Sequence, residues 1–196
     1  MIKRGILIFC IITVLLTVFM PILPLQGEGE VYNETIRLHV LANSDSQKDQ
    51  ELKLKIKDEI LKLLAVRLEN VNDKDTALRI IKESISEIQQ TAKNEISSQG
   101  YNYPCTVSVT EEKYPEKEYN GVTLPSGKYL SLRVLIGNAE GQNWWCVLFP
   151  TLCTTNAKPK QKLKEAGFTE PQIRILTEDD SPRYKLRFKI LEIFNG

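Results

Sequence analysis

The spacing of hydrophobic residues changes along the chain, and its first change separates a leading segment from the rest. Residues 5–20 form an uninterrupted apolar run, GILIFCIITVLLTVFM, behind the positive charges of Lys3 and Arg4. This layout is typical of a secretory signal peptide or a short N-terminal membrane anchor. We therefore predict a signal or anchor over residues 1–26, followed by a short tether over 27–35 and a single domain over 36–196.

The first part of this domain combines a strand with two amphipathic helices. Residues 36–41 alternate between apolar and polar side chains, as in a half-buried strand. Ser46 has an acidic residue three positions on, which is typical of a helix N-cap, and the apolar spacing predicts a helix to about Leu68. Isoleucine and alanine then recur every three or four residues over 77–96, which predicts a second helix ending before Gly100. Their short connection predicts an antiparallel helical hairpin.

The rest of the chain is dominated by a period of two. Trp144–Phe149 is apolar on both faces, so we expect it to be a central strand or to lie beneath covering helices. Tyr114–Gly127 carries an Asn-Gly turn signal and is expected to be a long loop or an extended hairpin arm. The order of elements predicts an α+β fold, with the helical hairpin packed on a mainly antiparallel sheet. Alternation predicts further strands in three ranges: 105–110, 130–136 and 184–190.

Composition and motifs argue against several classes of function. The chain has 196 residues and a formal net charge of +1, which gives no strong field for attracting nucleic acid. It holds one histidine and four cysteines, and no metal site is predicted. His39 lies on the polar side of its strand, where a solvated or capped imidazole is favoured over a Cys-His catalytic pair. Because hydrolase and phosphate-loop signatures are absent, neither an enzyme nor a cofactor is predicted.

Cys146 and Cys153 are the candidates for a disulfide. In an extended chain their Cα atoms would lie about 23 Å apart, whereas a disulfide needs about 7 Å or less. A bridge between them therefore requires a turn at Phe149 and Pro150. Two alternatives stay open, a bridge from Cys105 to Cys146 and three unpaired buried thiols.

Two adjacent tryptophans mark a candidate contact surface. Trp144 and Trp145 point to opposite faces of a strand, so one is expected in the core and the other can be exposed. An exposed tryptophan beside a turn is a plausible anchor for a partner, although core packing of both rings is the alternative.

Two separated motifs resemble a known family. The segment RLHVLANSDS (37–46) leads into a Leu- and Lys-rich helix, and NWWCVLFP (143–150) is followed by Leu152 and Cys153. Together with RFKILE (187–192), these segments resemble the stage II sporulation protein R family of endospore-forming Firmicutes.

The resemblance implies a role in signalling. Members are expected to be exported from the forespore into the intermembrane space, where they activate a membrane-embedded aspartic protease that processes the pro-form of the mother-cell sigma-E factor. Our hypothesis is that Trp144, Trp145 and Phe149, supported by Asn43 and Asp45, form or support the face that meets this protease. The alternatives are an exported thiol-dependent enzyme and a passive structural or binding domain of the envelope.

Overall fold

The computed structural model describes residues 28–152 and 158–177, together with residues 5, 9 and 11–14. Most of the predicted signal or anchor and the predicted strand at 184–190 lie outside these residues. Within them, no helix is long and apolar enough to cross a membrane. The strands are β1 (Ile36–Leu41), β2 (Cys105–Tyr114), β3 (Lys117–Tyr119), β4 (Val122–Leu124), β5 (Gly127–Ile136) and β6 (Asn143–Phe149). The helices are α2 (Glu28–Asn33), α3 (Gln47–Arg67), α4 (Lys74–Glu83), α5 (Ile85–Ser98), α6 (Pro159–Glu165) and α7 (Glu170–Thr177).

The main sheet has the strand order β2-β5-β1-β6, and β3 pairs with β4 in a separate hairpin. Strand β1 pairs antiparallel with β6, and β2 pairs antiparallel with β5. The inner pair, β1 with β5, is parallel, with Leu38 opposite Leu132. The predicted α+β class and mainly antiparallel sheet are therefore confirmed. Strand β6, however, is the outer strand among those described, where a central strand was one expectation.

Helix α3 forms as its sequence predicts. The Ser46 hydroxyl accepts a hydrogen bond from the Asp49 amide at 3.2 Å, which satisfies one of the donors that a helix N-terminus leaves unpaired. The buried side of the helix then follows the expected spacing of three to four residues. It consists of Asp49, Leu52, Lys53, Ile56, Ile60 and Leu64.

The second predicted helix is interrupted at Ser84, which separates α4 from α5. The Ser84 hydroxyl donates to the Ile80 carbonyl at 2.8 Å, a contact that bends helices because it competes with the backbone bond. Both pieces keep their predicted apolar positions in the core, including Ile81 and Ile88, each with no exposed surface. The expectation of one continuous helix is therefore wrong, although the buried positions were predicted correctly.

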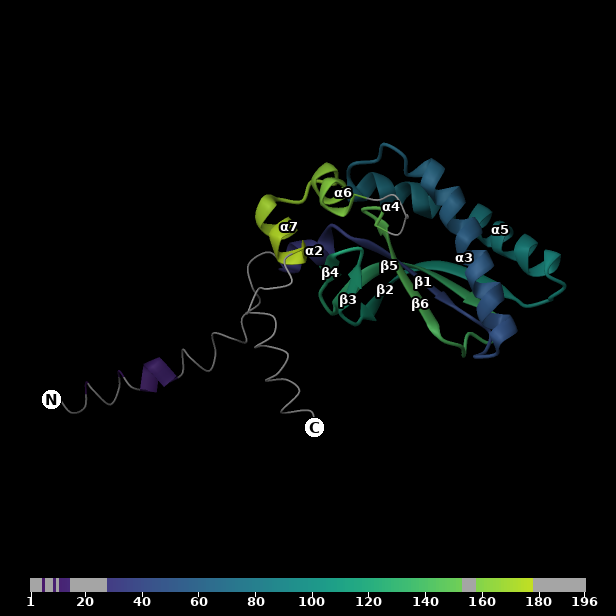
Figure 1. Ribbon diagram of the computed structural model, residues 1–196, viewed down its shortest axis with the longest axis horizontal. Coiled ribbons are helices and arrows are strands. Elements are labelled where there is room, and N and C mark those ends of the chain that lie inside the picture. Colours follow the sequence, from purple (N-terminus) through teal and green to yellow (C-terminus); the bar gives the residue numbers. More distant parts are fainter. Residues whose placement is uncertain (1–4, 6–8, 10, 15–27, 153–157, 178–196) are drawn as a thin grey trace.

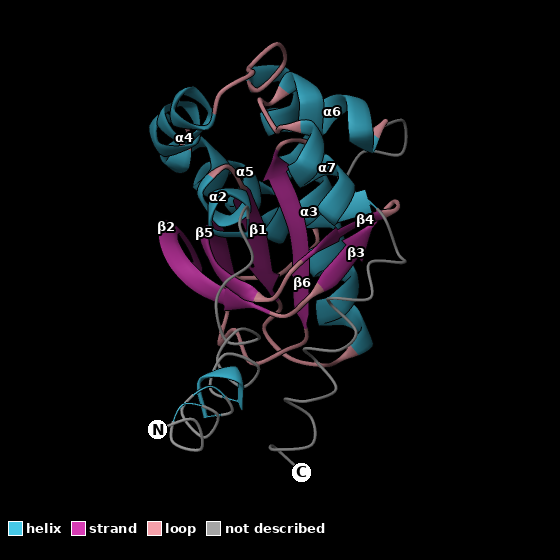
Figure 2. Cartoon of the chain, turned by 90° about the vertical axis from the view of Figure 1, so that its left-hand side faces the viewer, coloured by secondary structure: helices cyan, strands magenta, loops and turns pink. Residues whose placement is uncertain are grey.

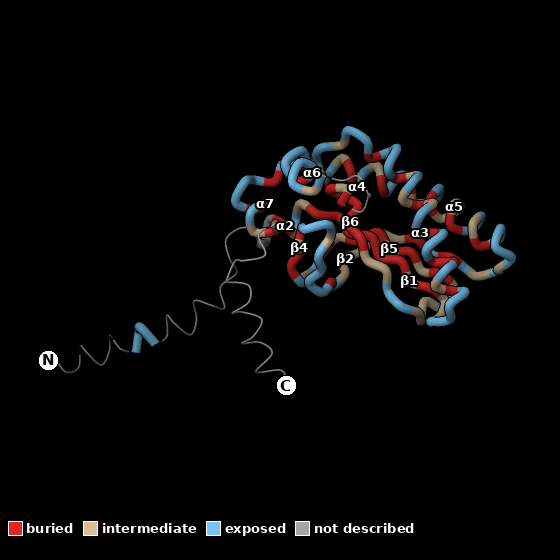
Figure 3. Tube along the Cα trace, in the orientation of Figure 1, coloured by how far each residue is buried: buried red, intermediate tan, exposed pale blue. Residues whose placement is uncertain are grey.

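The helices α3, α4 and α5 lie together on one side of the main sheet (Figure 1). Helix α5 packs against α3 and β2, and α3 also contacts β1, which confirms the helical hairpin. The sheet side chains that point toward this layer form the core. Figure 3 colours most of β1 and β5 as buried. They include Leu38, Val40, Leu132, Val134, Val107 and Cys146.

The segment expected to be a tether is ordered against the domain. Residues Glu28–Asn33 form α2, and Val31 has no exposed surface. The Tyr32 hydroxyl donates to the Ser126 carbonyl at 3.2 Å, and the Thr35 hydroxyl donates to the Val31 carbonyl at 2.7 Å. The tether prediction failed over these residues because one buried valine in a short polar segment gives no periodic pattern.

The C-terminal described segment carries two short helices. Helix α6 ends at Glu165, and Gly167, which follows the C-cap residue Ala166, has a φ of 88°, as suits a glycine after a helix. Helix α7 follows at once, and the Gln172 side chain accepts hydrogen bonds from the Thr169 amide and hydroxyl at 2.6 and 2.8 Å. The sequence Thr169-Glu-Pro-Gln172 has the spacing of a capping box, which was the available signal for α7.

Removing the buried part of α2 should lower the stability of the whole domain. We expect Val31→Ala to reduce the free energy of unfolding by about 1–2.5 kcal/mol, because two methyl groups leave a filled site. The exposed neighbour Asn33→Ala should change it by less than about 0.5 kcal/mol. Urea unfolding of the two variants measures the difference, and equal midpoints would show that α2 does not belong to the cooperative unit.

Candidate functional site

The sheet face opposite α3 and α5 carries a buried arginine. Arg37 has no exposed surface, and its Cζ lies 4.2 Å from the ring centre of Tyr114 and 4.8 Å from that of Tyr129. Its Nη2 donates to the Tyr119 hydroxyl at 2.6 Å, and its Nε donates to the Cys146 carbonyl at 3.2 Å. Among the described residues, Nη1 has no hydrogen-bond partner and the guanidinium has no carboxylate partner.

Aromatic faces therefore take the place of a counter-ion at Arg37. A buried charge without a partner is costly, and cation–π contacts recover part of that cost. Tyr119 belongs to β3, so the β3–β4 hairpin is held over this half of the face by the arginine. Burial raises the pKa of Tyr119, and the nearby guanidinium only partly offsets that rise. We call Arg37 and the three tyrosines 114, 119 and 129 the arginine cage.

The other half of the same face lies beyond the β3–β4 hairpin, which reaches its border with Lys117, whose Nζ lies 5.7 Å from the ring centre of Trp145. Its side chains are mostly half-buried or exposed, and they come from all four strands of the main sheet. Antiparallel sheets commonly leave one face in contact with water, but here the face also carries apolar side chains. We call this surface the open face; it consists of Leu41, His39, Thr106, Ser108, Thr110, Arg133, Leu135, Asn143 and Trp145.

His39 lies at the centre of the open face and is held on both sides. Its Nδ1 donates to the Glu112 carboxylate, whose oxygens lie at 3.0 and 3.2 Å, and its Nε2 lies 2.7 Å from Asn143 Oδ1. Arg133 Nε approaches the same carboxylate at 3.2 Å as an ion pair, without the alignment of a hydrogen bond. The imidazole is 8% exposed, so it is held by neighbours rather than solvated. The capped alternative of the sequence prediction is the correct one.

The two tryptophans separate as their strand positions predicted. Trp144 packs against the core on the helix side, and Lys57 Nζ lies 5.0 Å from its ring centre. Trp145 is half-buried on the open face, with ring centres of His39 and Tyr114 each 5.9 Å away. Of the predicted aromatic contact residues, Trp145 is therefore the one that presents part of its ring on the open face.

Phe149, the third predicted aromatic contact residue, is 2% exposed and belongs to the hydrophobic core. Its ring is packed in the core, so Phe149 does not form part of the contact surface, and only the supporting role in the hypothesis stays a prediction. Phe149 is buried because it is the last of four consecutive buried residues of β6, 146–149.

Asn43 and Asp45 tie two loops together. Asn43 Oδ1 accepts from the Asn138 amide at 3.0 Å, and its Nδ2 donates to Asp49 at 2.9 Å. Asp45 Oδ1 accepts from the Gln142 amide at 2.7 Å. These bonds join the β1–α3 loop to the β5–β6 turn, an arrangement that we call the loop latch. Both residues thus support the end of the open face instead of presenting unused polar groups to a partner.

The buried carboxylate of the loop latch is Asp49. Burial raises the pKa of its carboxyl, but hydrogen bonds from the Ser44 and Asn43 side chains outweigh that effect. The pKa of Asp49 is therefore below its ordinary value, and the ionised form is the one that the latch stabilises.

The described cysteines lie on the helix side of the sheet. Cys105 is a free, buried thiol, and burial raises its pKa to about 11. Cys146 is disulfide-bonded, so the alternative bridge from Cys105 to Cys146 is wrong, as is the alternative of three unpaired thiols. Cys153, the predicted partner of Cys146, lies outside the described residues. His39 points to the opposite face from both described cysteines, so no Cys-His pair forms among them.

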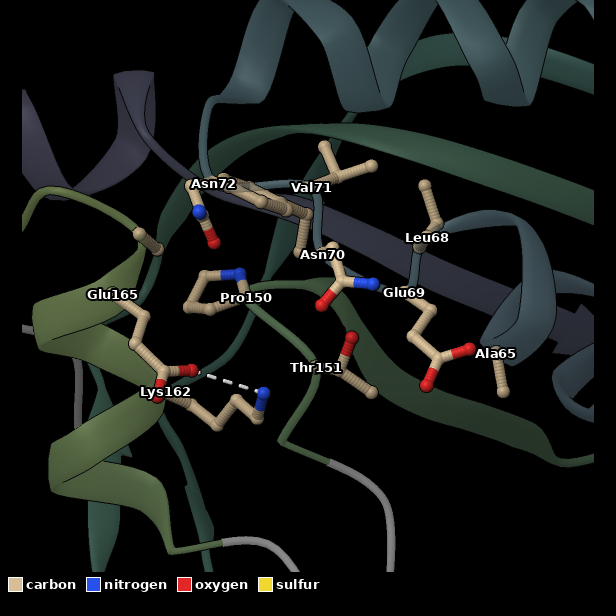
Figure 4. Close-up of a pocket in the computed structure, with 12 residues that line it drawn as sticks. Ala65, Leu68, Glu69, Asn70, Val71, Asn72, Pro150, Thr151, Lys162 and Glu165 are labelled. Carbon is tan, nitrogen blue, oxygen red and sulfur yellow. Dashed lines mark hydrogen bonds and ion pairs between the residues drawn. The ribbon is translucent and has the colours of Figure 1, made fainter.

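A cleft of about 600 Å³ lies where β6 ends (Figure 4). It is bordered by the loop after α3, by Pro150 and Thr151, and by α6. The chain turns at Pro150 and Thr151, as the sequence required, and the peptide bond between Phe149 and Pro150 is cis. Lys162 and Glu165 on α6 bind each other at 3.0 Å, and no histidine or cysteine lines the cleft. Its described lining therefore offers neither a thiol or imidazole nor an unpaired lysine.

Within the described ranges, no group of three or more histidine, cysteine or acidic residues is placed to hold a metal ion. The sequence prediction missed two residues that organise this region, Arg37 and Glu112. Strand alternation put Arg37 on the polar side, where exposure is the usual outcome, and gave no sign of the three tyrosines that bury it. Their clustering depends on strands more than 75 positions away in the sequence.

These features define an α+β protein with helices on one face of its sheet and a partly apolar open face on the other. Residues 32–159 match the family described as stage II sporulation protein R. The protein of that name from Bacillus subtilis (strain 168) is 35% identical over 133 residues, which cover 68% of this chain and 59% of the Bacillus protein. The chain belongs to the stage II sporulation protein R family. No solved structure matches the chain.

The family match confirms the resemblance inferred from the two motifs and identifies a protein of sporulation stage II. It begins at Tyr32 in α2 and ends at Pro159, so it includes all six described strands. The arginine cage, the open face and the loop latch all lie within it. Because the chain spans less than two thirds of the Bacillus protein, that relative's own activity and partners enter here only as proposals.

Breaking the loop latch should destabilise the protein more than removing an exposed amide nearby. We expect Asn43→Ala to lower the free energy of unfolding by about 2 kcal/mol, because it leaves the Asn138 amide without its acceptor and removes the Asn43 hydrogen bond to the buried Asp49 carboxylate, which then keeps the Ser44 hydroxyl. Asn138→Ala keeps its backbone amide and should cost less than about 0.5 kcal/mol. Chemical unfolding compares the variants, and a neutral Asn43→Ala would refute the latch.

Proposed function

We propose that this protein is an exported signal that activates a membrane-embedded aspartic protease, the peptidase that processes the pro-form of the mother-cell sigma-E factor. In this proposal it leaves the forespore and acts in the intermembrane space, either cleaved or anchored by its N-terminal segment. The observation that carries the proposal is membership of the stage II sporulation protein R family, which ties the chain to the sporulation stage in question.

The arrangement of the described residues supports binding over catalysis as the mode of action. The one histidine is occupied by Glu112 and Asn143, and the thiol of Cys105 has a pKa of about 11 and is buried. A thiol that stays protonated near neutral pH is a poor nucleophile, which argues against the thiol-dependent enzyme considered from the sequence. A half-buried tryptophan beside His39 and Tyr114, on a face that also carries leucine, serine and threonine side chains, suits a protein contact instead.

A complementation experiment tests the proposal. The gene is expressed from a forespore promoter in a sporulating host that lacks its own stage II sporulation protein R, and removal of the sigma-factor pro-sequence is followed by immunoblot. We expect processing to be restored. If the host protease fails to respond, the protease from the organism of this sequence is supplied. Failure with that matched protease, despite confirmed export, would overturn the proposal and favour a passive envelope domain.

Within that assay, Trp145 should matter for activation and not for folding. We expect Trp145→Ala to reduce processing at least tenfold, since a buried contact tryptophan is often worth 2 kcal/mol or more, while Trp145→Phe keeps most activity. Val66→Ala is the matched control, because Val66 is a 75% exposed apolar side chain on α3, on the far side of the sheet. Normal accumulation together with undiminished processing by Trp145→Ala would exclude this residue from the contact.

A further inference from the structure

Strand β2 is an unusually long and regular edge of the sheet. It runs for ten residues, Cys105–Tyr114, whereas strands of five or six are the most common. Its pairing with β5 continues without a register shift, so no bulge bends it away. Figure 2 shows β2 as an outermost strand, and only β5 pairs with it among the described strands. Pro104 and Pro115 stand immediately before and after it, so the uninterrupted edge has defined ends.

The direction of the backbone groups along β2 follows from one hydrogen bond. The Gly137 amide donates to the Pro104 carbonyl at 2.8 Å, and hydrogen-bonded pairs recur at every second position of an antiparallel ladder. Even-numbered residues of β2 therefore bond to β5, and odd-numbered residues direct their amides and carbonyls outward. Gln89 on α5 donates to the outward carbonyl of Cys105 at 2.7 Å, which agrees with this assignment.

Beyond Cys105, the outward groups have no hydrogen-bond partner in the described part of the chain. They belong to Val107, Val109, Glu111 and Lys113. Proteins usually protect such an edge with charged residues, proline, bulges or short strands. Here charges begin only at Glu111, so the stretch from Val107 to Thr110 carries none of these protections.

The side chains along the edge indicate what can pair with it. Val107 is 8% exposed and, with Val109, points to the side of the sheet that α5 covers. A second copy of β2, paired antiparallel about Val109, would place Glu111 against Val107. Pairing about Thr110 would place Glu111 against Val109, and pairing about Glu111 would oppose the two carboxylates. Each arrangement buries or opposes charge, so β2 is a poor partner for itself.

We propose that the outer edge of β2 pairs with an extended segment of a second protein, which adds a fifth strand beside Val107–Lys113. The segment carries apolar side chains next to Val107 and Val109 and a basic side chain next to Glu111. Backbone hydrogen bonds supply the pairing, and these alternate side chains supply the selectivity. The added strand also widens the open face, since Ser108 and Thr110 border it. That the second protein is the sigma-factor-processing protease rests on the proposed function.

Substitutions at Glu111 separate what the backbone amide contributes to partner binding from what the side chain contributes. Glu111→Pro removes an outward amide and places a ring in the path of an added strand, without touching the β2–β5 ladder. Glu111→Ala removes the same carboxylate and keeps the amide. In the complementation assay with the full chain, we expect Glu111→Ala to reduce processing by at most about threefold, as for an exposed ion pair, and Glu111→Pro by more than tenfold.

The comparison is designed so that the two proposals fail separately. If the wild-type chain does not restore processing with its matched protease, the proposed function fails. If the wild type works and Glu111→Pro performs like Glu111→Ala, the strand-addition inference is overturned while the function stands.

A second measurement covers the case in which the proline variant does not accumulate. Amide hydrogen exchange of the wild-type full chain is followed by mass spectrometry, alone and after co-purification with the protease in detergent. We expect exchange in peptides spanning Val107–Lys113 to slow at least tenfold on binding, with peptides spanning α4 as the internal control. Unchanged exchange over β2 in the complex would refute the inference.

Discussion

Burial of the Arg37 guanidinium against tyrosine rings is the constraint that divides the structure into a covered half and an open half. The arginine sits in β1, a strand flanked on both sides, so its charge cannot reach water along the sheet. Tyr114 and Tyr129 supply ring faces from β2 and β5, and Tyr119 brings the β3–β4 hairpin over the top. The cage fixes one edge of the open face. It holds the hairpin together with the hydrogen bond from Asn120 Nδ2 to the Leu152 carbonyl at 3.2 Å and the packing of α7 against β4.

The edge of the arginine cage explains which part of the sheet can contact another protein. Side chains beyond the cage come from all four strands, and they include the half-buried ring of Trp145 beside His39. The Glu112 carboxylate holds the imidazole on one side and meets Arg133 on the other, so the surface is preorganised by internal contacts. A rigid binding surface loses little conformational freedom on association, which suits a protein that acts by contact. The β2 edge borders the same surface, so strand pairing and face contact can be made by one partner.

The helical elements were accessible from the sequence because their signals are local. The Ser46 cap and the spacing of Leu52, Ile56 and Ile60 lie within one helix, and they predicted α3 closely. The break at Ser84 was missed because a serine within a helical pattern is usually tolerated. Its hydrogen bond to the Ile80 carbonyl depends on the rotamer of the serine side chain, which the sequence does not specify. Helix α2 was missed for a related reason: its single buried valine is stabilised by β5, not by its own sequence pattern.

The sequence by itself determined the four strands of the main sheet, the helix faces of α3 to α5, the opposed directions of Trp144 and Trp145, and the family. These follow from local periodicity or from motifs, which are written in consecutive residues. Only the tertiary structure decided that β1 and β5 run parallel, that Arg37 is buried, that Phe149 is core, and that Asn43 and Asp45 serve the loop latch. The physical reason is that burial and hydrogen bonding of these residues depend on chain segments far away in sequence, whose register is set by packing of the whole sheet.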